Sequence, residues 1–321
     1  MNRPYVPQTV LDAAHARSAA RATRQWGEAD RLRDEIVAAG WRVIDSGTNF
    51  RLEPASPPDA VDGDLVRYGR SAAVPSRMEE EATARATVLI VATDAPASAG
   101  RSISGASAQL GAEDQLLVLL DGPNPGLESE LGILPTDVEV IRTATPLGAA
   151  AAINIGLRRA VGEVVILLDP ELEPVGDFIT PLVSALSDAD VAVAGARGRR
   201  TPDLRAIEDV RDPGDATTIA RGVLAFRRAD GISAAPIDEG LVSGRHVDSW
   251  WSLTLRAGTG VVAGDPVRRA VVIGGLPVQP IDGFDVPAQE APDATRQARR
   301  NFYRVFKKFR DRPDLLGRGP E

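Results

Sequence analysis

The sequence lacks cysteine altogether, contains only two histidines, and has an aromatic content of 4%. Without cysteine the chain cannot form disulfides, use a thiol in catalysis or bind a metal through thiolates. His15 and His246 are far apart in the sequence, which argues against a histidine-rich metal site. These absences exclude thiol chemistry and disfavour a histidine metal centre.

Long apolar runs are also missing. The sequence contains no run of about 18 consecutive apolar residues, the length that a membrane-spanning helix needs. The opening segment MNRPYVPQTVLDAAHARSAARA lacks the apolar middle region of a secretory signal. We therefore expect a cytoplasmic protein without a transmembrane segment. A net charge of −8 disfavours a broad nucleic-acid-binding face, although it leaves room for a local basic patch.

Three apolar runs end near an acidic residue, in a chain whose 43% hydrophobic residues can supply a real core. Residues 88–91 precede Asp94, residues 116–120 precede Asp121, and residues 164–168 precede Asp169. Such unbroken runs are typical of central parallel strands that are covered on both faces. Ligands of open α/β sheets bind outside the carboxyl ends of the strands, so we expect these side chains to face one crevice.

The acidic residues differ in how readily an ordinary structural role explains them. Asp94 precedes Pro96 and a helix-like stretch, so a helix N-cap is as good an explanation as a ligand contact. Asp121 lies in a Gly-Pro-Asn-Pro-Gly turn, where turn chemistry would suffice. Asp169 and Glu171 are two residues apart in a segment that Pro170 favours as extended, so their carboxylates should converge. Converging carboxylates repel unless a cation lies between them, and oxygen ligands suit Mg²⁺ or Mn²⁺.

The chain divides into predicted domains by composition. Residues 8–24 and 27–39 resemble two helices, and WRVI and NFRL flank a reversal that predicts a β-hairpin. The following segment is rich in proline and charge and is typical of a linker. The predicted domains are a helical module at 1–53, a linker at 54–84, an α/β domain at 85–290 and an amphipathic helix at 291–321.

The first module resembles the C-terminal appendage of cysteinyl-tRNA synthetases. The similarity lies in the stretch HARSAARATRQWGEADRLRDEIVAAGWRVIDSGTNFRLEP, with its arginine-containing helix, its tryptophan before AD, its LRDE and its short hairpin. That region belongs to the anticodon-binding end of the synthetases, so the resemblance implies RNA contact through Arg17, Arg21, Arg24, Arg31 or Arg33. We rank tRNA contact below the alternative, a docking or oligomerisation element whose arginines are solvated. Aminoacylation is not expected, because no synthetase catalytic domain is present.

Residues from about 87 to 287 resemble the family-two glycosyltransferases with the GT-A fold. The elements of that family occur in order as VLIVATDAP, LLVLLDG, PLGAAAAINIGLRRAVGE, VVILLDPELEP and GVLAFRRADGISAAPIDEGLVSGRHVDSWWSLTLRAG. The resemblance implies a doubly wound, mostly parallel sheet with helices on both faces. It also implies a nucleotide-sugar donor, an acceptor that the sequence does not name, and an inverting, metal-assisted transfer.

Carried over by position, the resemblance assigns roles to single residues. Thr93 and Asp94 flank the nucleotide, and Asp121 takes the place of the acid that reads the base. Asp169 and Glu171 fall on the family's D-x-D metal motif, and Asp248 takes the place of the general base. Trp250, Trp251 and His246 are then expected on the acceptor side, with core packing of the tryptophans and a surface position of the histidine as the alternatives.

The D-x-D motif ends in glutamate here, and only half of the usual Glu-Asp pair is present at Asp248. The alternative function is therefore a degenerate glycosyltransferase-like protein that binds a nucleotide or RNA without turnover. No G-x-x-x-x-G-K-[ST] loop occurs, and no G-x-G-x-x-G motif follows a strand, so nucleotide hydrolases and dinucleotide oxidoreductases rank lower.

The C-terminal segment TRQARRNFYRVFKKFRDRPDLL has an apolar stripe of Phe302, Val305, Phe306 and Phe309 among basic residues. Such a helix could lie on an anionic membrane as a peripheral contact, but we favour packing against the parent domain because the stripe spans only a few turns.

Overall fold

The computed structural model describes residues 6–46, 49–55, 58–131, 138–258, 267–281 and 292–316. The chain forms two compact units, Met1–Arg70 and Ser71–Glu321. The boundary between them falls inside the segment predicted as a linker. Each unit is described by itself.

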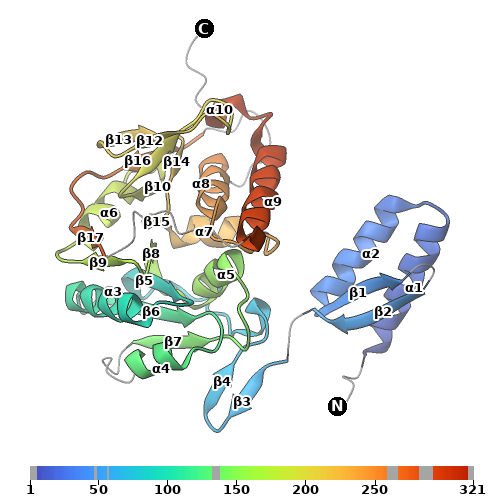
Figure 1. The fold of residues 1–321 in the computed structure, drawn as a ribbon. Helices are drawn as coiled ribbons and strands as arrows, with labels where there is room; N and C mark the ends of the chain where they lie inside the picture. Colours follow the sequence, from blue (N-terminus) through green and yellow to red (C-terminus); the bar gives the residue numbers. More distant parts are fainter. Residues whose placement is uncertain are drawn as a thin grey trace. The chain divides into compact units, whose positions relative to one another are not determined.

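The smaller unit packs two helices against a two-stranded antiparallel sheet (Figure 1). Helices α1 (Gln8–Ala22) and α2 (Trp26–Ala38) precede strands β1 (Trp41–Ser46) and β2 (Asn49–Pro54), and a second hairpin follows with β3 (Ala60–Asp62) and β4 (Leu65–Arg67). Ile36 of α2 and Trp41 of β1 are buried with Val10 and Ala14 of α1. The predicted helices and hairpin are confirmed.

The larger unit is built on an eight-stranded sheet with the order β13-β16-β10-β15-β8-β5-β6-β7. Its strands are β5 (Ala84–Ala92), β6 (Asp114–Leu120), β7 (Glu139–Arg142), β8 (Gly162–Leu168), β10 (Val191–Gly195), β13 (Gly214–Ala216), β15 (Val223–Arg227) and β16 (Arg269–Val272). All neighbouring pairs between β8 and β7 are parallel, whereas β15 and β13 run antiparallel to the strands beside them. The mostly parallel sheet agrees with the predicted fold class.

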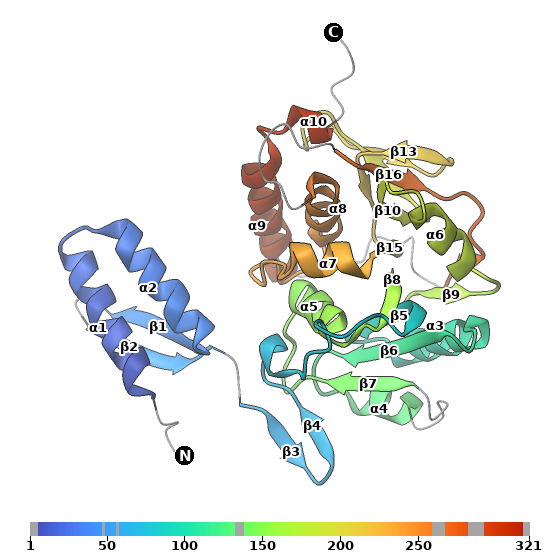
Figure 2. The same ribbon diagram turned by 180° about the vertical axis from the view of Figure 1, so that it is seen from behind.

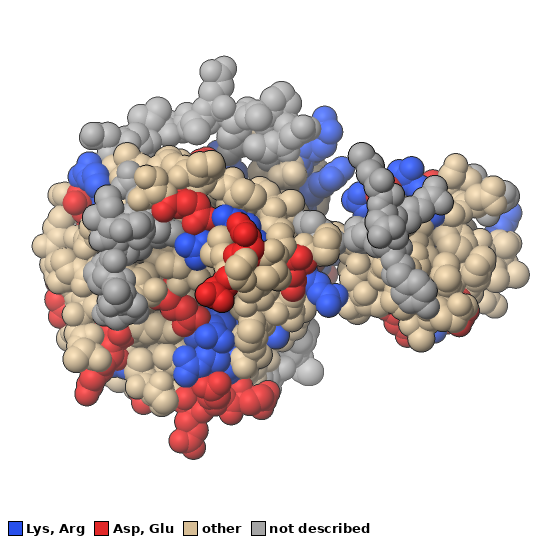
Figure 3. Space-filling view, turned by 90° about the horizontal axis from the view of Figure 1, so that it is seen from below, with Lys and Arg blue, Asp and Glu red and all other residues tan. Residues whose placement is uncertain are grey.

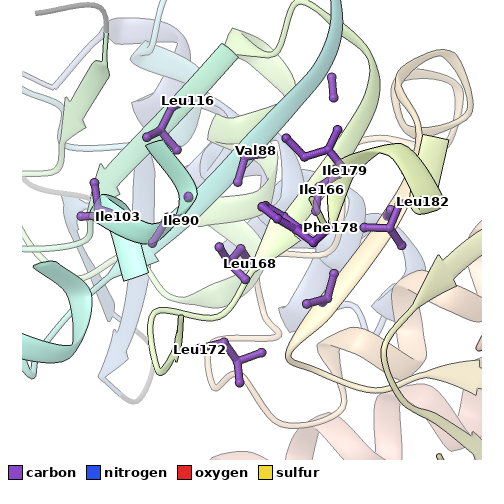
Figure 4. Close-up of a cluster of buried hydrophobic side chains, with 14 of the residues drawn as sticks. Val88, Ile90, Ile103, Leu116, Ile166, Leu168, Leu172, Phe178, Ile179 and Leu182 are labelled. Carbon is purple, nitrogen blue, oxygen red and sulfur yellow. The ribbon is translucent and has the colours of Figure 1, made fainter. Parts of the chain in front are cut away.

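Helices cover both faces of this sheet (Figures 1 and 2). One face packs against α3 (Pro96–Gln109), α4 (Pro125–Leu131) and α6 (Ile179–Leu186), and the other packs against α5 (Ala149–Arg159), α7 (Arg228–Ala234) and α8 (Val247–Ala257). In the first layer Phe178 lies among Ile166, Leu168 and the side chains of α6 (Figure 4). The central strands are buried on both sides, which explains why their sequences are unbroken apolar runs.

Short strands extend the edges of the larger unit. Strand β9 (Leu172–Pro174) pairs with β17 (Val278–Pro280), and β11 (Gly198–Arg200) lies between β12 (Glu208–Val210) and β14 (Thr218–Ile219). The first residues of the unit form a 3-10 helix, η1 (Ser71–Ala73), and Val74 is buried. The Nε of Arg158 donates to the carbonyl oxygen of Val74 at 2.8 Å, so this end of the predicted linker packs against α5.

The C-terminal segment contains α9 (Pro292–Phe309) and α10 (Pro313–Leu316). Val305 and Phe309 of α9 are buried with Leu253 of α8 and Leu315 of α10. The apolar stripe of α9 thus packs against the larger unit, as favoured from the sequence. Within the described ranges, every helix falls short of the length and apolarity that a membrane crossing requires.

Candidate functional site

The strand order reverses beside β5. The chain adds β6 and β7 on one side of β5 and then crosses back to place β8 on the other side. Ligands of open α/β sheets bind at the carboxyl ends of the strands at such a reversal. A cavity of about 560 Å³ lies there, and most of the predicted site residues line it: Thr93, Asp94, Asp121, Asp169, Glu171, Asp248 and Trp251.

Asp121 follows β6 and is almost fully buried. Its carboxylate accepts hydrogen bonds from the backbone N–H groups of Leu147 at 2.7 Å and Gly148 at 2.8 Å, and from the Thr143 hydroxyl at 3.0 Å. Gly148 has a φ of +95°, and a Cβ there would lie 2.6 Å from the carbonyl oxygen of Val242. Asp121 therefore holds a tight glycine turn at the start of α5 against the cavity.

Thr93 and Asp94 follow β5 at the rim of the cavity. The Thr93 hydroxyl lies 3.2 Å from Oδ1 of Asp94. Helix α3 begins after Ala95, which has a φ of +49°, and no side chain caps its N-terminus. The alternative that Asp94 is a helix cap is thus not observed, and its carboxylate faces the cavity instead.

Asp169 and Glu171 converge on one guanidinium. The Nε of Arg221 donates to Oδ2 of Asp169 at 2.9 Å, and a terminal nitrogen of Arg221 donates to Oε2 of Glu171 at 3.1 Å. The segment is not extended as expected, because residues 170–171 form a turn in which the N–H of Leu172 donates to the carbonyl oxygen of Asp169 at 3.0 Å. The turn still brings the two carboxylates to one cation.

The electrostatics of this pair reflect crowding of negative charge. Burial raises the pKa of the Glu171 carboxyl above its ordinary value, and the neighbouring charge of Asp169 raises it further. The positive charge of Arg221 acts in the opposite direction, and Asp94 adds a smaller raising effect. The site therefore has a marked preference for positive charge.

Sheet register explains how Arg221 reaches these carboxylates. Strand β15 runs antiparallel to β8, with Val223 opposite Leu168. The N–H of Asp169 donates to the carbonyl oxygen of Gly222 at 2.8 Å, which continues the pairing beyond both strands. The residue before Gly222 then lies across from the turn at 170–171. Arg221 could not be identified from the sequence, because the IARGVLAF segment gives no indication of which strand it will pair with.

Asp248 lies in the first turn of α8 and is buried. Its Oδ2 accepts from a terminal nitrogen of Arg199 at 2.9 Å and from the backbone N–H of Arg221 at 2.8 Å. Its Oδ1 accepts from the backbone N–H of Ser249 at 2.7 Å. Arg199 comes from β11, another partner that the sequence did not indicate. Arg221 consequently touches both acidic groups, Asp248 through its backbone and the Asp169–Glu171 pair through its side chain.

The two tryptophans of α8 have different environments. Trp251 is fully buried against Phe226, lines the cavity, and has an indole Nε1 without a hydrogen-bond partner among the described residues. Trp250 is not among the residues that line the cavity, and its ring packs edge-on against Phe309 with Lys308 Nζ 4.1 Å from its centroid. Both tryptophans therefore take part in core packing, the alternative considered from the sequence, and an acceptor-side role for either remains a prediction.

His246 immediately precedes α8 with a φ of +66°, and its ring centroid lies 5.7 Å from that of Phe302. Burial lowers the pKa of the His246 imidazole, and the nearby charge of Asp248 opposes that change. His246 is not among the residues that line the cavity. An acceptor-side role for it remains a prediction.

The cavity chemistry suits an anionic ligand that arrives with a cation. In the described part of the chain, no cluster of three or more His, Asp or Glu side chains could hold a metal ion unaided. Asp169 and Glu171 nevertheless offer two carboxylates at one point. Mg²⁺ and similar ions are commonly held by one or two carboxylates together with substrate phosphates, so the donor set fits a cation that binds with its substrate.

Comparisons with known proteins find different relatives for the N-terminal module and for the larger unit. Three curated cysteine–tRNA ligases match short stretches: 40% identity over 52 residues in Chlamydia trachomatis serovar A, 45% over 49 residues in Chlamydia pneumoniae, and 44% over 50 residues in Opitutus terrae. These matches cover 15–16% of this chain and only 10–11% of each ligase. They support the resemblance of the N-terminal module to part of such ligases.

Two solved glycosyltransferases share the fold of the larger unit. GalNAc-T7 with UDP, GalNAc and Mn²⁺ superimposes with a TM-score of 0.57 and 16% identity, over 70% of this chain and 48% of that one. The mannosyltransferase PcManGT from Pyrobaculum calidifontis, in complex with GDP-Man and Mn²⁺, has a TM-score of 0.51 and 15% identity, over 74% of this chain and 68% of that one. The family model described as glycosyl transferase family 2 matches residues 87–230. The match to the glycosyl transferase family 2 model at residues 87–230 therefore lies within a unit that has the GT-A fold.

Proposed function

We propose that the larger unit is a glycosyltransferase that moves a sugar from a nucleotide-sugar donor to an acceptor hydroxyl. The observation that carries this proposal is the convergence of Asp169 and Glu171 on one cationic group at the carboxyl edge of a GT-A sheet. A nucleoside diphosphate leaving group requires positive charge at such a point. The cavity of about 560 Å³ is of the size that small-molecule sites usually have.

Asp169 and Glu171 are the residues that would hold Mn²⁺ or Mg²⁺. Such an ion, when bound, would neutralise the diphosphate that leaves the sugar. Structural neighbours of this unit were solved with UDP or GDP-Man and Mn²⁺, which supports a divalent ion and a nucleotide-sugar donor here. Thr93 and Asp94 at the end of β5 then lie on the nucleotide side of the cavity.

Asp121 helps to shape the cavity in which the donor is proposed to bind. Its hydrogen bonds to the 147–148 turn fix one wall of the cavity, which prepares that wall for a ligand before it binds. The role of base-reading acid that the family resemblance gives Asp121 remains part of this proposal, because a carboxylate has more acceptor sites than the described contacts occupy.

Asp248 is the proposed general base. It lines the same cavity as the carboxylate pair, and its orientation is fixed by Arg199 and by the backbone N–H of Arg221. It would take the proton from an acceptor hydroxyl as that oxygen attacks the anomeric carbon, and direct displacement inverts that carbon.

A second function is favoured by one specific observation. Both acidic centres are already engaged by internal arginines, Asp248 by Arg199 and the Asp169–Glu171 pair by Arg221. This arrangement of ion pairs would also suit a protein that binds a nucleotide-sugar without transferring the sugar. The two functions share the same cavity and differ in turnover.

Turnover of nucleotide-sugars distinguishes the two functions. Binding of UDP-, GDP- and dTDP-sugars is first measured by calorimetry with and without Mn²⁺, and any donor that binds is then incubated with the protein while release of the nucleoside diphosphate is followed. Slow release to water, accelerated by a suitable acceptor, supports the transferase. Tight binding without any release supports the binding protein, and absence of binding by every donor contradicts both.

A further inference from the structure

One feature of the cavity is not explained by a metal-assisted transferase. The place between Asp169 and Glu171, where a divalent cation is expected, is filled by the guanidinium of Arg221. We propose that Arg221 is an internal counter-ion that competes with the divalent cation for these two carboxylates. The cation then binds tightly only when a nucleoside diphosphate offers Arg221 other anionic oxygens. This inference rests on the proposed function for the nature of the ligand.

The backbone at Arg221 is held by contacts that do not involve its side chain. Its N–H donates to Asp248 at 2.8 Å, and the next residue, Gly222, accepts from the N–H of Asp169 at 2.8 Å. The Arg221 side chain is 51% exposed, and the Glu171 side chain is 43% exposed. The Asp169 side chain is only 11% exposed, so its pair with Arg221 is the stronger of the two, whereas an exposed pair such as that with Glu171 is worth at most about 1 kcal/mol. Because the strand is held through backbone hydrogen bonds, the guanidinium can leave without disturbing the strand that positions it.

The charge balance explains why a counter-ion is needed. Asp169 and Glu171 lie together, and Asp94 is near enough for its charge to act on Glu171. Arg221 offsets one of these three negative charges in the ligand-free chain. A divalent ion would have to displace this favourable pairing, whereas a metal-bound diphosphate brings oxygens that suit the planar fork of an arginine. Arg221 would thus couple cation binding to nucleotide binding.

The test measures Mn²⁺ binding by the full-length chain in the absence of nucleotide, from the loss of the free Mn²⁺ signal in electron paramagnetic resonance. Arg221→Gln should bind Mn²⁺ about tenfold or more tightly than the unmodified chain, because a positive charge a few ångströms from the carboxylates has been removed. Arg221→Lys retains the charge and should show a smaller gain. It also serves as a second test if Arg221→Gln is poorly folded.

Two controls make the result specific. Arg200→Gln removes the same charge from β11, where Arg200 donates to the carbonyl oxygen of Asp215, and should leave Mn²⁺ affinity unchanged. Adding Asp169→Asn to Arg221→Gln should abolish the gain. The proposal is overturned if Arg221→Gln binds Mn²⁺ no more tightly than the unmodified chain, or if the gain survives the loss of Asp169. Failure of UDP, GDP and dTDP to bind would instead contradict the proposed function and leave the Mn²⁺ comparison intact.

Discussion

Asp121 and Asp248 of the candidate site are each fixed by partners that come from different parts of the chain. Backbone N–H groups of Leu147 and Gly148 hold Asp121, and Arg199 holds Asp248. Fixed carboxylates suit catalysis because a transition state is stabilised best by groups that need not reorganise. Substitution of single residues can therefore test two features of the site, the proposed base Asp248 and the buried imidazole of His246.

Replacement of Asp248 by asparagine should lower sugar transfer by about a hundredfold or more, because the change removes the proton acceptor while preserving shape. Donor affinity should stay nearly the same, since Asp248 is proposed to act on the acceptor. Steady-state rates and calorimetry on the same preparation check both points. Arg199→Gln is the matched comparison: it removes the ion pair that orients Asp248 but leaves the carboxylate, so it should lower the transfer rate less than Asp248→Asn does. Normal rates in Asp248→Asn would show that another residue is the base.

His246 should make the larger unit less stable in acid. Burial lowers the pKa of its imidazole below the ordinary value of 6.5, with Arg199 and Arg245 acting in the same direction and Asp248 opposing them. The unfolded chain therefore binds this proton at a higher pH than the folded chain does. Its stabilising contribution is complete above the unfolded pKa and is lost as the pH falls through the folded pKa.

The measurement is the free energy of unfolding in urea, followed between about pH 7 and about pH 5. His246→Asn should weaken its acid dependence, and asparagine tolerates the φ of +66° at this position. His15→Asn, in the smaller unit, provides a control with the same change of residue type. An unaltered slope in His246→Asn would show that this imidazole does not contribute.

At the scale of elements, α9 is the clearest case of an amphipathic segment whose role the sequence left open. Its apolar stripe packs on α8 and α10, and Tyr303 on its other side is 53% exposed. Phe309→Ala should lower the free energy of unfolding of the larger unit by about 3–5 kcal/mol. Tyr303→Ala should change it by less than about 0.5 kcal/mol.

Urea unfolding followed by tryptophan fluorescence suits this comparison, because the ring of Trp250 packs against Phe309. Equal losses in the two variants would contradict the packing of α9 that we describe.

A helix held by its apolar stripe has only its basic face left for a membrane, so any vesicle binding by α9 should be weak and should disappear at high salt.

The elements that could be predicted from the sequence are those governed by local pattern. The apolar runs at 88–91, 116–120 and 164–168 are unbroken because both faces of those strands are covered, and this placed Asp94, Asp121 and Asp169 at one edge of the sheet. Arg199 and Arg221 could not be foreseen. Their positions depend on the antiparallel pairing of β15 with β8 and of β11 with β14, which no local pattern specifies.

At the scale of the whole molecule, the division into two compact units predicts independent folding. A chain that begins at Ser71 should remain soluble and keep any nucleotide binding. A chain that begins at Ala84 should be less stable, because it loses buried Val74 and its hydrogen bond from Arg158. Thermal melts of the two truncated chains check this order, and an insoluble chain from Ser71 would contradict the unit boundary.

The smaller unit should not bind tRNA at physiological salt. Several of its arginines are paired with carboxylates of the same unit, Arg17 and Arg21 with Asp45, and Arg31 with Glu28. On the face shown in Figure 3, the smaller unit carries acidic as well as basic side chains. Counterion release by so few available cations gives little affinity for phosphates.

A gel-shift titration of residues 1–70 with labelled tRNA measures this directly, and a tight, salt-dependent shift would show that the unit is an RNA-binding element. The alternative of docking predicts that deletion of the unit changes the oligomeric mass seen by light scattering. Trp26 is 59% exposed and Val37 is 50% exposed, so this unit presents apolar side chains that a protein partner could cover.

The central claim is that the cavity binds a nucleoside diphosphate through the carboxylates at the end of β8. It is tested most directly by calorimetry of UDP, GDP and dTDP with Mn²⁺, with chelator, and with Mn²⁺ after Glu171→Gln. We expect at least one nucleotide to bind with Mn²⁺, chelator to weaken this binding, and Glu171→Gln to reproduce much of the loss. Binding that is equally tight with chelator and in Glu171→Gln, or absence of binding by all three nucleotides, would contradict it.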